Sequence, residues 1–165
     1  MPCATALRSG GPKHLARWRV LDSWTSGVGH NVELDYALLG EWARVNAIGT
    51  LTVIDGSFLR VNAPIGAVVP IAVAGRIRFL EEPYEANVGV QFELPQGLTL
   101  SFEILATAVE ATSYGEGRRH VLFALNTQLP VLSAGRCKVG VFLDGVLARE
   151  LCFSMEPPTI IEPAS

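Results

Sequence analysis

Three glutamates in the middle of the chain, Glu81, Glu82 and Glu85, have the chemistry of a site for a hard cation. Their carboxylate oxygens are ligands that Ca²⁺ prefers, and Glu116 in a later loop would add another. The Asp-x-Asp spacing usual in calcium loops is absent, which favours a solvated acidic loop. Glu81, Glu82 and Glu85 therefore stand as metal-ligand candidates, and the segment 80–86 as a candidate loop for calcium or a small ligand.

His120, Cys137 and Cys152 are the soft ligands and nucleophiles of residues 32–156. A zinc site needs four ligands, or three with an open position, and a nucleophilic thiol needs a histidine and an orienting acid. One histidine and two separated cysteines do not match either pattern. The pattern favours two buried, inert thiols and an ordinary histidine at the start of a strand.

The run Gly115-Glu116-Gly117-Arg118-Arg119 has the composition of an anion-binding loop. It does not lead from a strand into a helix, however, and it lacks the lysine and hydroxyl of a phosphate loop. We interpret it as a surface loop with two solvated arginines. No nucleophile elbow or paired-histidine zinc motif occurs in the sequence. An enzyme would therefore need Glu81, Glu85 or His120 to converge in one pocket, and no cofactor is expected.

The elements that would position these residues are β-strands, because apolar and polar residues alternate with a period of two. The alternation is clearest at residues 88–94 and again at 98–108, and Pro95-Gln96-Gly97 between them is typical of a turn. These segments predict an antiparallel hairpin with one apolar and one solvated face. Further strands are expected at 71–79 and from residue 121 onward.

Residues 33–45 have a mixed pattern. One parity is shared by Leu34, Tyr36, Leu38 and Trp42. This predicts a strand with a bulge at Gly40, and a helix over the later residues is the alternative. The run from Asn46 to Gly49 then predicts a hairpin turn into a strand over 50–54.

The last hairpin, from Cys137 to Phe153, has two candidate registers. A two-residue turn at Asp144-Gly145 would set Cys137 opposite Cys152, where a disulfide is geometrically feasible. A three-residue loop over 143–145 would instead align both apolar sets on one face. We predict the three-residue loop, which places the two cysteines on opposite faces.

Short strands separated by frequent turns predict an all-β protein, a two-layer antiparallel β-sandwich of Ig-like or C2-like type with about seven to nine strands. A closed barrel is the alternative. We expect a basic, disordered tail over 1–31, the sandwich over 32–156 and a proline-rich tail over 157–165. Leu15, Trp18 and Leu21 recur at helical spacing beside arginines, so the tail around Trp18 is an alternative contact for a membrane surface or a partner.

The composition narrows the classes of partner. Hydrophobic residues make up 49% of the 165-residue chain, which either fills the core or favours self-association and coverage by another protein. The formal net charge of −3 gives no electrostatic footprint for a polyanion, so nucleic acid is not expected as a partner. No run approaches the ~18 apolar residues of a membrane helix, and no apolar signal-peptide segment begins the chain. We therefore expect a cytoplasmic protein.

The run Leu34-Asp35-Tyr36-Ala37-Leu38-Leu39, together with Ala134-Gly135 and Asp144-Gly145, resembles a family of short bacterial β-sandwich proteins described only as a domain of unknown function. That family has an L-D-Y-A-L-L-like first strand and a closing hairpin with A-G and D-G pairs. The resemblance would cover about Val32 to Met155. It implies a compact β domain and assigns no catalytic residue.

These patterns lead to three hypotheses of function. The first is a non-catalytic β-sandwich that binds protein, as a homo-oligomer or as an accessory part of an assembly, through its surfaces and sheet edges. The second is a domain that binds calcium or a small ligand through the acidic loop. The third is an enzyme whose site the motifs do not reveal.

Overall fold

The computed structural model describes residues 31–82, 85–107, 112–113 and 119–158, and it is all-β. The strands are β1 (Val32–Gly40), β2 (Trp42–Val45), β3 (Leu51–Ile54), β4 (Arg60–Asn62), β5 (Val68–Phe79), β6 (Glu85–Glu93), β7 (Thr99–Thr107), β8 (Thr112–Ser113), β9 (Arg119–Pro130), β10 (Gly135–Leu143) and β11 (Val146–Glu156). Among the described residues there is no helix with the length and apolar character needed to cross a membrane.

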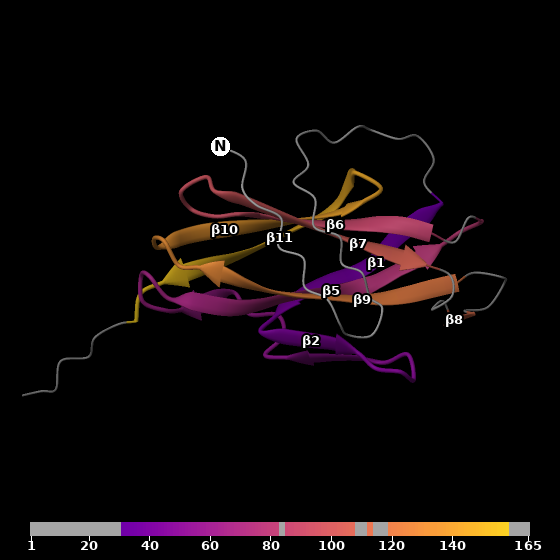
Figure 1. Ribbon diagram of the computed structural model, residues 1–165, viewed down its shortest axis with the longest axis horizontal. Helices are drawn as coiled ribbons and strands as arrows, with labels where there is room; N and C mark the ends of the chain where they lie inside the picture. Colours follow the sequence, from indigo (N-terminus) through magenta and orange to yellow (C-terminus); the bar gives the residue numbers. More distant parts are fainter. Residues whose placement is uncertain (1–30, 83–84, 108–111, 114–118, 159–165) are drawn as a thin grey trace, which may run out of the picture.

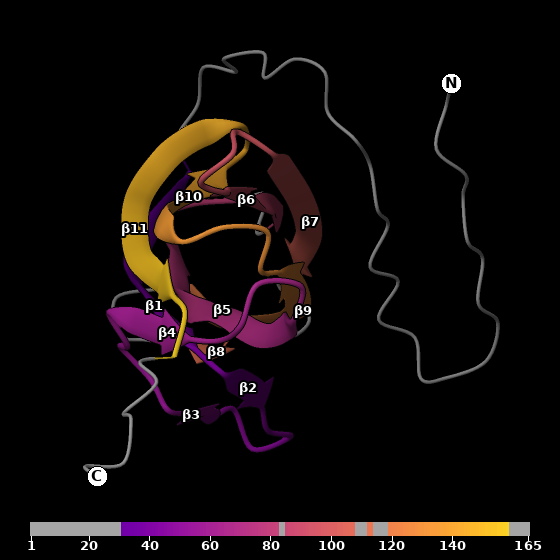
Figure 2. The same ribbon diagram turned by 90° about the vertical axis from the view of Figure 1, so that its left-hand side faces the viewer.

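Two facing sheets form the body of the molecule. One has the strand order β1-β5-β9-β8 and the other β4-β11-β10-β6-β7. Figure 1 shows the sheets stacked on each other, and the end view in Figure 2 shows β11 and β7 curving around the space between them. Because no ladder joins the two sheets in the described part of the chain, the sandwich prediction is confirmed over the closed barrel.

The core fills the space between the two sheets, since alternate residues of each strand face the opposite sheet. The hairpin predicted from residues 88–108 is present as β6 and β7, with Glu93 opposite Thr99. The fully buried side chains that β5 and β6 direct into this core are Ile71, Val73, Ile77, Phe79, Val88, Val90 and Phe92. The apolar parity of these strands is therefore the inner face of the sandwich.

The first strand departs from its predicted pattern. Its bulge lies at Asp35, where the β1–β5 register shifts, and not at Gly40. One extra residue changes the parity, so that Ala37 and Leu39 face the core while Leu38 is only half-buried and Trp42 is exposed. The apolar alternation continues across the bulge without marking it, which is why the sequence did not locate it.

The turn of the final hairpin also differs from the prediction. Leu143 pairs with Val146, so the loop is the two-residue turn Asp144-Gly145. Both turn residues have positive φ, 47° and 83°, as a type I′ turn requires. The predicted three-residue loop is therefore wrong.

The predicted separation of the cysteines is nevertheless correct, for a different reason. A bulge shifts the β10–β11 register after Val141, and the extra residue on β11 is Ala148. Cys137 consequently lies opposite Phe153 in the core, whereas Cys152 lies opposite Lys138 on the outer face. Both cysteines are free thiols.

Candidate functional site

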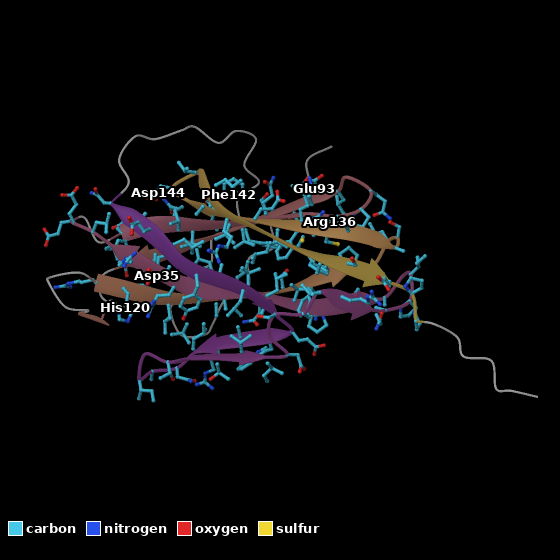
Figure 3. The ribbon with its side chains drawn as sticks, turned by 180° about the vertical axis from the view of Figure 1, so that it is seen from behind. Asp35, Glu93, His120, Arg136, Phe142 and Asp144 are labelled. Carbon is cyan, nitrogen blue, oxygen red and sulfur yellow. The ribbon has the colours of Figure 1, made fainter. Side chains whose placement is uncertain are left out.

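The acidic candidates and His120 lie toward one end of the sandwich. Phe79 at the end of β5 pairs with Arg119, next to His120, and Glu85 begins β6 just beyond the same end of β5. Glu81 and Glu82 lie in the connection between these strands. Figure 3 shows His120 at this end together with Asp35 and the Asp144 turn. Topology thus brings the candidates to one region without placing them in one pocket.

The acidic loop does not form a metal centre from the described residues. Glu81, Glu82 and Glu85 are exposed, and Asn31 Nδ2 donates to the backbone carbonyl of Glu82 at 3.2 Å. Within residues 31–82, 85–107, 112–113 and 119–158, no three His, Cys, Asp or Glu side chains are grouped to hold an ion. Glu116 and Arg118 lie outside the described residues, so the calcium hypothesis stays a prediction.

The outer face of β1 and β5 carries a network of charge pairs near the same end. Arg76 Nε contacts Asp35 Oδ2 at 2.7 Å, and Arg78 Nη2 contacts Glu33 at 2.8 Å and Asp35 at 3.3 Å. The Arg76 guanidinium also lies 5.3 Å from the centroid of the Tyr36 ring. Two cations and two anions compensate each other, so the network ties β1 to β5 and offers little net charge to a ligand.

The two thiols are not arranged for catalysis with His120. Cys137 is buried in the core, and burial raises the pKa of its thiol to about 11. Cys152 is half-buried on the outer face, where its Sγ accepts a hydrogen bond from Arg136 Nη2 at 3.2 Å. Figure 3 shows Arg136 in the half of the molecule away from His120. The thiol and histidine pair that nucleophilic catalysis requires is therefore not assembled from these residues.

A shallow depression of about 440 Å³ lies between β1 and the β10–β11 turn. It is lined by Val32, Glu33, Leu34, Leu143, Val146 and Ala148. Glu81, Glu85 and His120 are not among these lining residues, and one carboxylate among aliphatic side chains supplies no acid–base pair. The depression gives no support to the enzyme hypothesis.

The feature that the sequence did not reveal is a third layer made by the β2–β3 hairpin. Figures 1 and 2 show this hairpin lying outside β5 and β9, on the face away from the core. The chain reaches it at Gly40, where an added Cβ would lie 2.5 Å from Val53 Cγ1. A glycine is therefore needed where β1 ends and the hairpin folds back over its own sheet.

Small side chains allow the hairpin to lie close to the sheet. Ala43 of β2 is buried against Ala72 and Ala74 of β5, and Leu51 and Val53 of β3 pack around this contact. Because the three residues in contact are alanines, the backbones of β2 and β5 can approach each other closely. The underside of the hairpin thus forms a small second core.

Asn126 of β9 joins the hairpin to the sheet by hydrogen bonds. The Ala43 amide donates to Asn126 Oδ1 at 2.9 Å, and Asn126 Nδ2 donates to the Ala43 carbonyl at 2.8 Å. One side-chain amide therefore pairs with both backbone groups of a single residue, as a neighbouring strand would. This contact holds the middle of β2 in place.

The outward face of the hairpin is apolar at the end that follows β1. Trp42 and Ile54 are cross-strand partners, and they remain 42% and 49% exposed. Ile48 in the hairpin turn is 85% exposed, and the turn itself is fixed by Asn46 Nδ2 donating to Thr50 Oγ1 and Thr52 Oγ1, both at 3.0 Å. The hairpin thus presents large apolar side chains to solvent at both of its ends; we call the cross-strand pair Trp42 and Ile54 the hairpin patch.

No family model and no curated protein matches the chain, so its membership of the resembled family stays a prediction. Solved structures similar in shape to this chain include two from Pseudomonas species. An alkylpurine DNA glycosylase from Pseudomonas fluorescens, bound to DNA with an abasic-site analogue, aligns with a TM-score of 0.46 at 11% identity over 76% of this chain. The chain spans 30% of the glycosylase.

The second structure is an immunoglobulin-like protein from Pseudomonas aeruginosa. It aligns with a TM-score of 0.39 at 15% identity, over 79% of this chain and 100% of its own length. With TM-scores below 0.5, neither structure bears on the function of this chain. The functional argument therefore depends on the surfaces described above.

Proposed function

We propose that this protein is a non-catalytic protein-binding module that contacts its partner through the hairpin patch. The observation that carries the proposal is the exposed cross-strand pair of Trp42 and Ile54 on a hairpin held in place by Asn126. Tryptophan is enriched among the residues that dominate binding energy at protein interfaces. Exposed apolar side chains on a fixed support lose little conformational entropy when a partner covers them.

The partner class that fits this surface is a folded protein with an apolar patch of its own. The face is not purely apolar, because Arg44 and Thr52 are the next outward cross-strand pair after Trp42 and Ile54. A polar pair at the rim of an apolar centre is the usual arrangement of a non-obligate interface. The module would therefore bind a partner reversibly.

The experiment compares which proteins the immobilised wild type and its variants capture from an extract of the cells that make this protein. Full-length protein is immobilised as the wild type, as a Trp42→Thr/Ile54→Thr variant, and as an Ile65→Thr control that removes an exposed apolar side chain elsewhere. We expect the wild type and the control to retain the same protein, and the double variant to bind it at least about tenfold more weakly. Threonine keeps the β-propensity of both positions, and thermal unfolding of each variant is measured beside the capture, because about half of each replaced side chain is buried.

Two results would contradict the proposal. One is equal capture by the wild type and the double variant. The other is the absence of any protein retained by the wild type beyond a blank support.

A further inference from the structure

The outer edge of β7 has the features of an unprotected pairing site. β7 runs from Thr99 to Thr107, and among the strands that the structure describes it pairs with β6 alone, in a register without a shift. Proteins usually protect long edge strands with lysine, proline, a bulge or short length, because the unpaired backbone groups would otherwise recruit another strand. β7 has no proline, lysine or bulge, and its one charged residue is Glu103.

The strands at the other ends of the two sheets differ from β7 in this respect. β4 is 3 residues long and β8 is 2 residues long. β1 carries a bulge whose extra residue is the charged Asp35. β7 is thus the terminal strand that combines length, regular register and a nearly uncharged sequence.

The core beneath β7 is also incompletely covered. Leu100, Phe102 and Ile104 point toward the core but are only half-buried, whereas the β6 residues directly opposite them, Phe92, Val90 and Val88, have 0% exposure. On the outer face Leu105 is 53% exposed. A strand added beside β7 would remove this apolar surface from water, which stabilises the assembly.

The hydrogen bonds of the β6–β7 turn show which backbone groups point outward. The Leu94 amide donates to the Leu98 carbonyl at 2.9 Å, so this pair is a hydrogen-bonded one. Such pairs alternate along an antiparallel ladder, so even-numbered residues of β7 bond to β6. The amides and carbonyls of Thr99, Ser101, Glu103 and Leu105 therefore face the outer edge.

We propose that a second copy of this chain pairs antiparallel with this edge, so that two five-stranded sheets join into one across a two-fold axis at Phe102. In this register Phe102 faces Phe102 of the second copy, and Leu100 faces Ile104, all on the core side. On the outer side Ser101 faces Glu103, and the outward-pointing backbone groups form the new hydrogen-bonded pairs. The strand is thus complementary to itself.

The charge of Glu103 disfavours the neighbouring register whose two-fold axis lies at Glu103. A two-fold axis at Glu103 would set the two carboxylates directly opposite each other, which is destabilising. The axis at Phe102 avoids this contact and brings the two aromatic rings together, where the side chains of a non-hydrogen-bonded pair approach most closely. The surface used is separate from the hairpin patch, so this inference does not depend on the proposed function.

Position 101 offers a matched test, because it faces Glu103 of the second copy. Ser101→Glu sets like charges opposite each other twice in the dimer, Ser101→Lys sets opposite charges there, and Ser101→Glu/Glu103→Lys restores opposite charges with the signs exchanged. The full chain of each variant is analysed by size-exclusion chromatography with light scattering, over a dilution series from about 100 µM. Circular dichroism confirms that each variant is folded.

We expect the wild type to have twice the 17.7 kDa chain mass at the highest concentration. Ser101→Glu should raise the dimer dissociation constant by about tenfold, Ser101→Lys should not raise it, and the exchanged double variant should return it toward the wild-type value. A wild type that is monomeric throughout the series overturns the proposal. A wild-type dimer whose dissociation constant is the same in Ser101→Glu and Ser101→Lys also overturns it, since the contact would then lie elsewhere.

Discussion

At the scale of single residues, Cys137 couples the stability of the fold to pH. Burial raises the pKa of its thiol from 9.0 to about 11. Between these values the unfolded chain loses the thiol proton while the folded chain keeps it, so the unfolded state is favoured as the pH rises. The stabilising contribution of the protonated thiol is complete below pH 9 and is lost as the pH increases toward about 11.

This predicts a specific difference between the wild type and a Cys137→Val variant, which keeps an apolar side chain of similar size and removes the titration. Urea unfolding at several values from pH 8 upward should show the free energy of unfolding falling more steeply for the wild type. Groups shared by both proteins contribute equally, so the difference isolates Cys137. Parallel pH profiles for the two proteins would contradict the argument.

At the scale of elements, the β2–β3 hairpin depends on one side chain of β9. Asn126→Ala removes both hydrogen bonds to Ala43 and leaves its amide and carbonyl without these partners. We expect a loss of about 1–3 kcal/mol in the free energy of unfolding, or local detachment of the hairpin detected as faster hydrogen exchange at residues 42–54. Gln128→Ala, at an exposed position two residues along β9, is the control and should change neither quantity. Equal effects from both substitutions would show that Asn126 has no special role.

The hairpin also shows why part of the fold could be predicted from the sequence and part could not. The turn at Asn46 to Gly49 is a local signal, as is the Pro95-Gln96-Gly97 turn between β6 and β7, and both are present in the structure. The position of the β2–β3 hairpin over β5 depends instead on Ala72, Ala74 and Asn126, which are distant in sequence. An alanine or asparagine in a strand carries no local sign of the layer that will cover it.

The bulges at Asp35 and Ala148 were missed for a related reason. Period-two alternation predicts which residues face the core only while residues of paired strands match one to one. An extra residue at a bulge reverses the parity of the residues that follow it. The extra residue of the β1 bulge is Asp35, and its carboxylate forms ion pairs with Arg76 and Arg78 on β5. The benefit of a bulge is therefore a tertiary contact, which the sequence of one strand does not contain.

At the scale of the whole molecule, the two proposed contacts lie on different sheets. The β2–β3 hairpin, which carries the hairpin patch, lies on the outer face of the sheet β1-β5-β9-β8, and the β7 edge ends the other sheet. Pairing at β7 therefore leaves the Trp42 and Ile54 pair exposed on each copy. A dimer formed in this way would be bivalent, so that two hairpin patches could engage a multivalent partner with greater avidity than one.

Dimerisation at β7 also makes thermal stability depend on protein concentration. Because only folded chains form the dimer, a higher protein concentration raises the unfolding midpoint by mass action. Above the dimer dissociation constant, a tenfold rise in protein concentration stabilises each chain by about 0.7 kcal/mol. For a chain of this size the corresponding increase in Tm is roughly 1–3 °C. We expect this increase for the wild type and for Ser101→Lys in calorimetry at about 10 and 100 µM, and a smaller one for Ser101→Glu, whose dissociation constant is higher. A Tm that does not change with concentration in any of the three proteins would exclude the β7 dimer, whereas an equal increase in all three would place the dimer contact on a different surface.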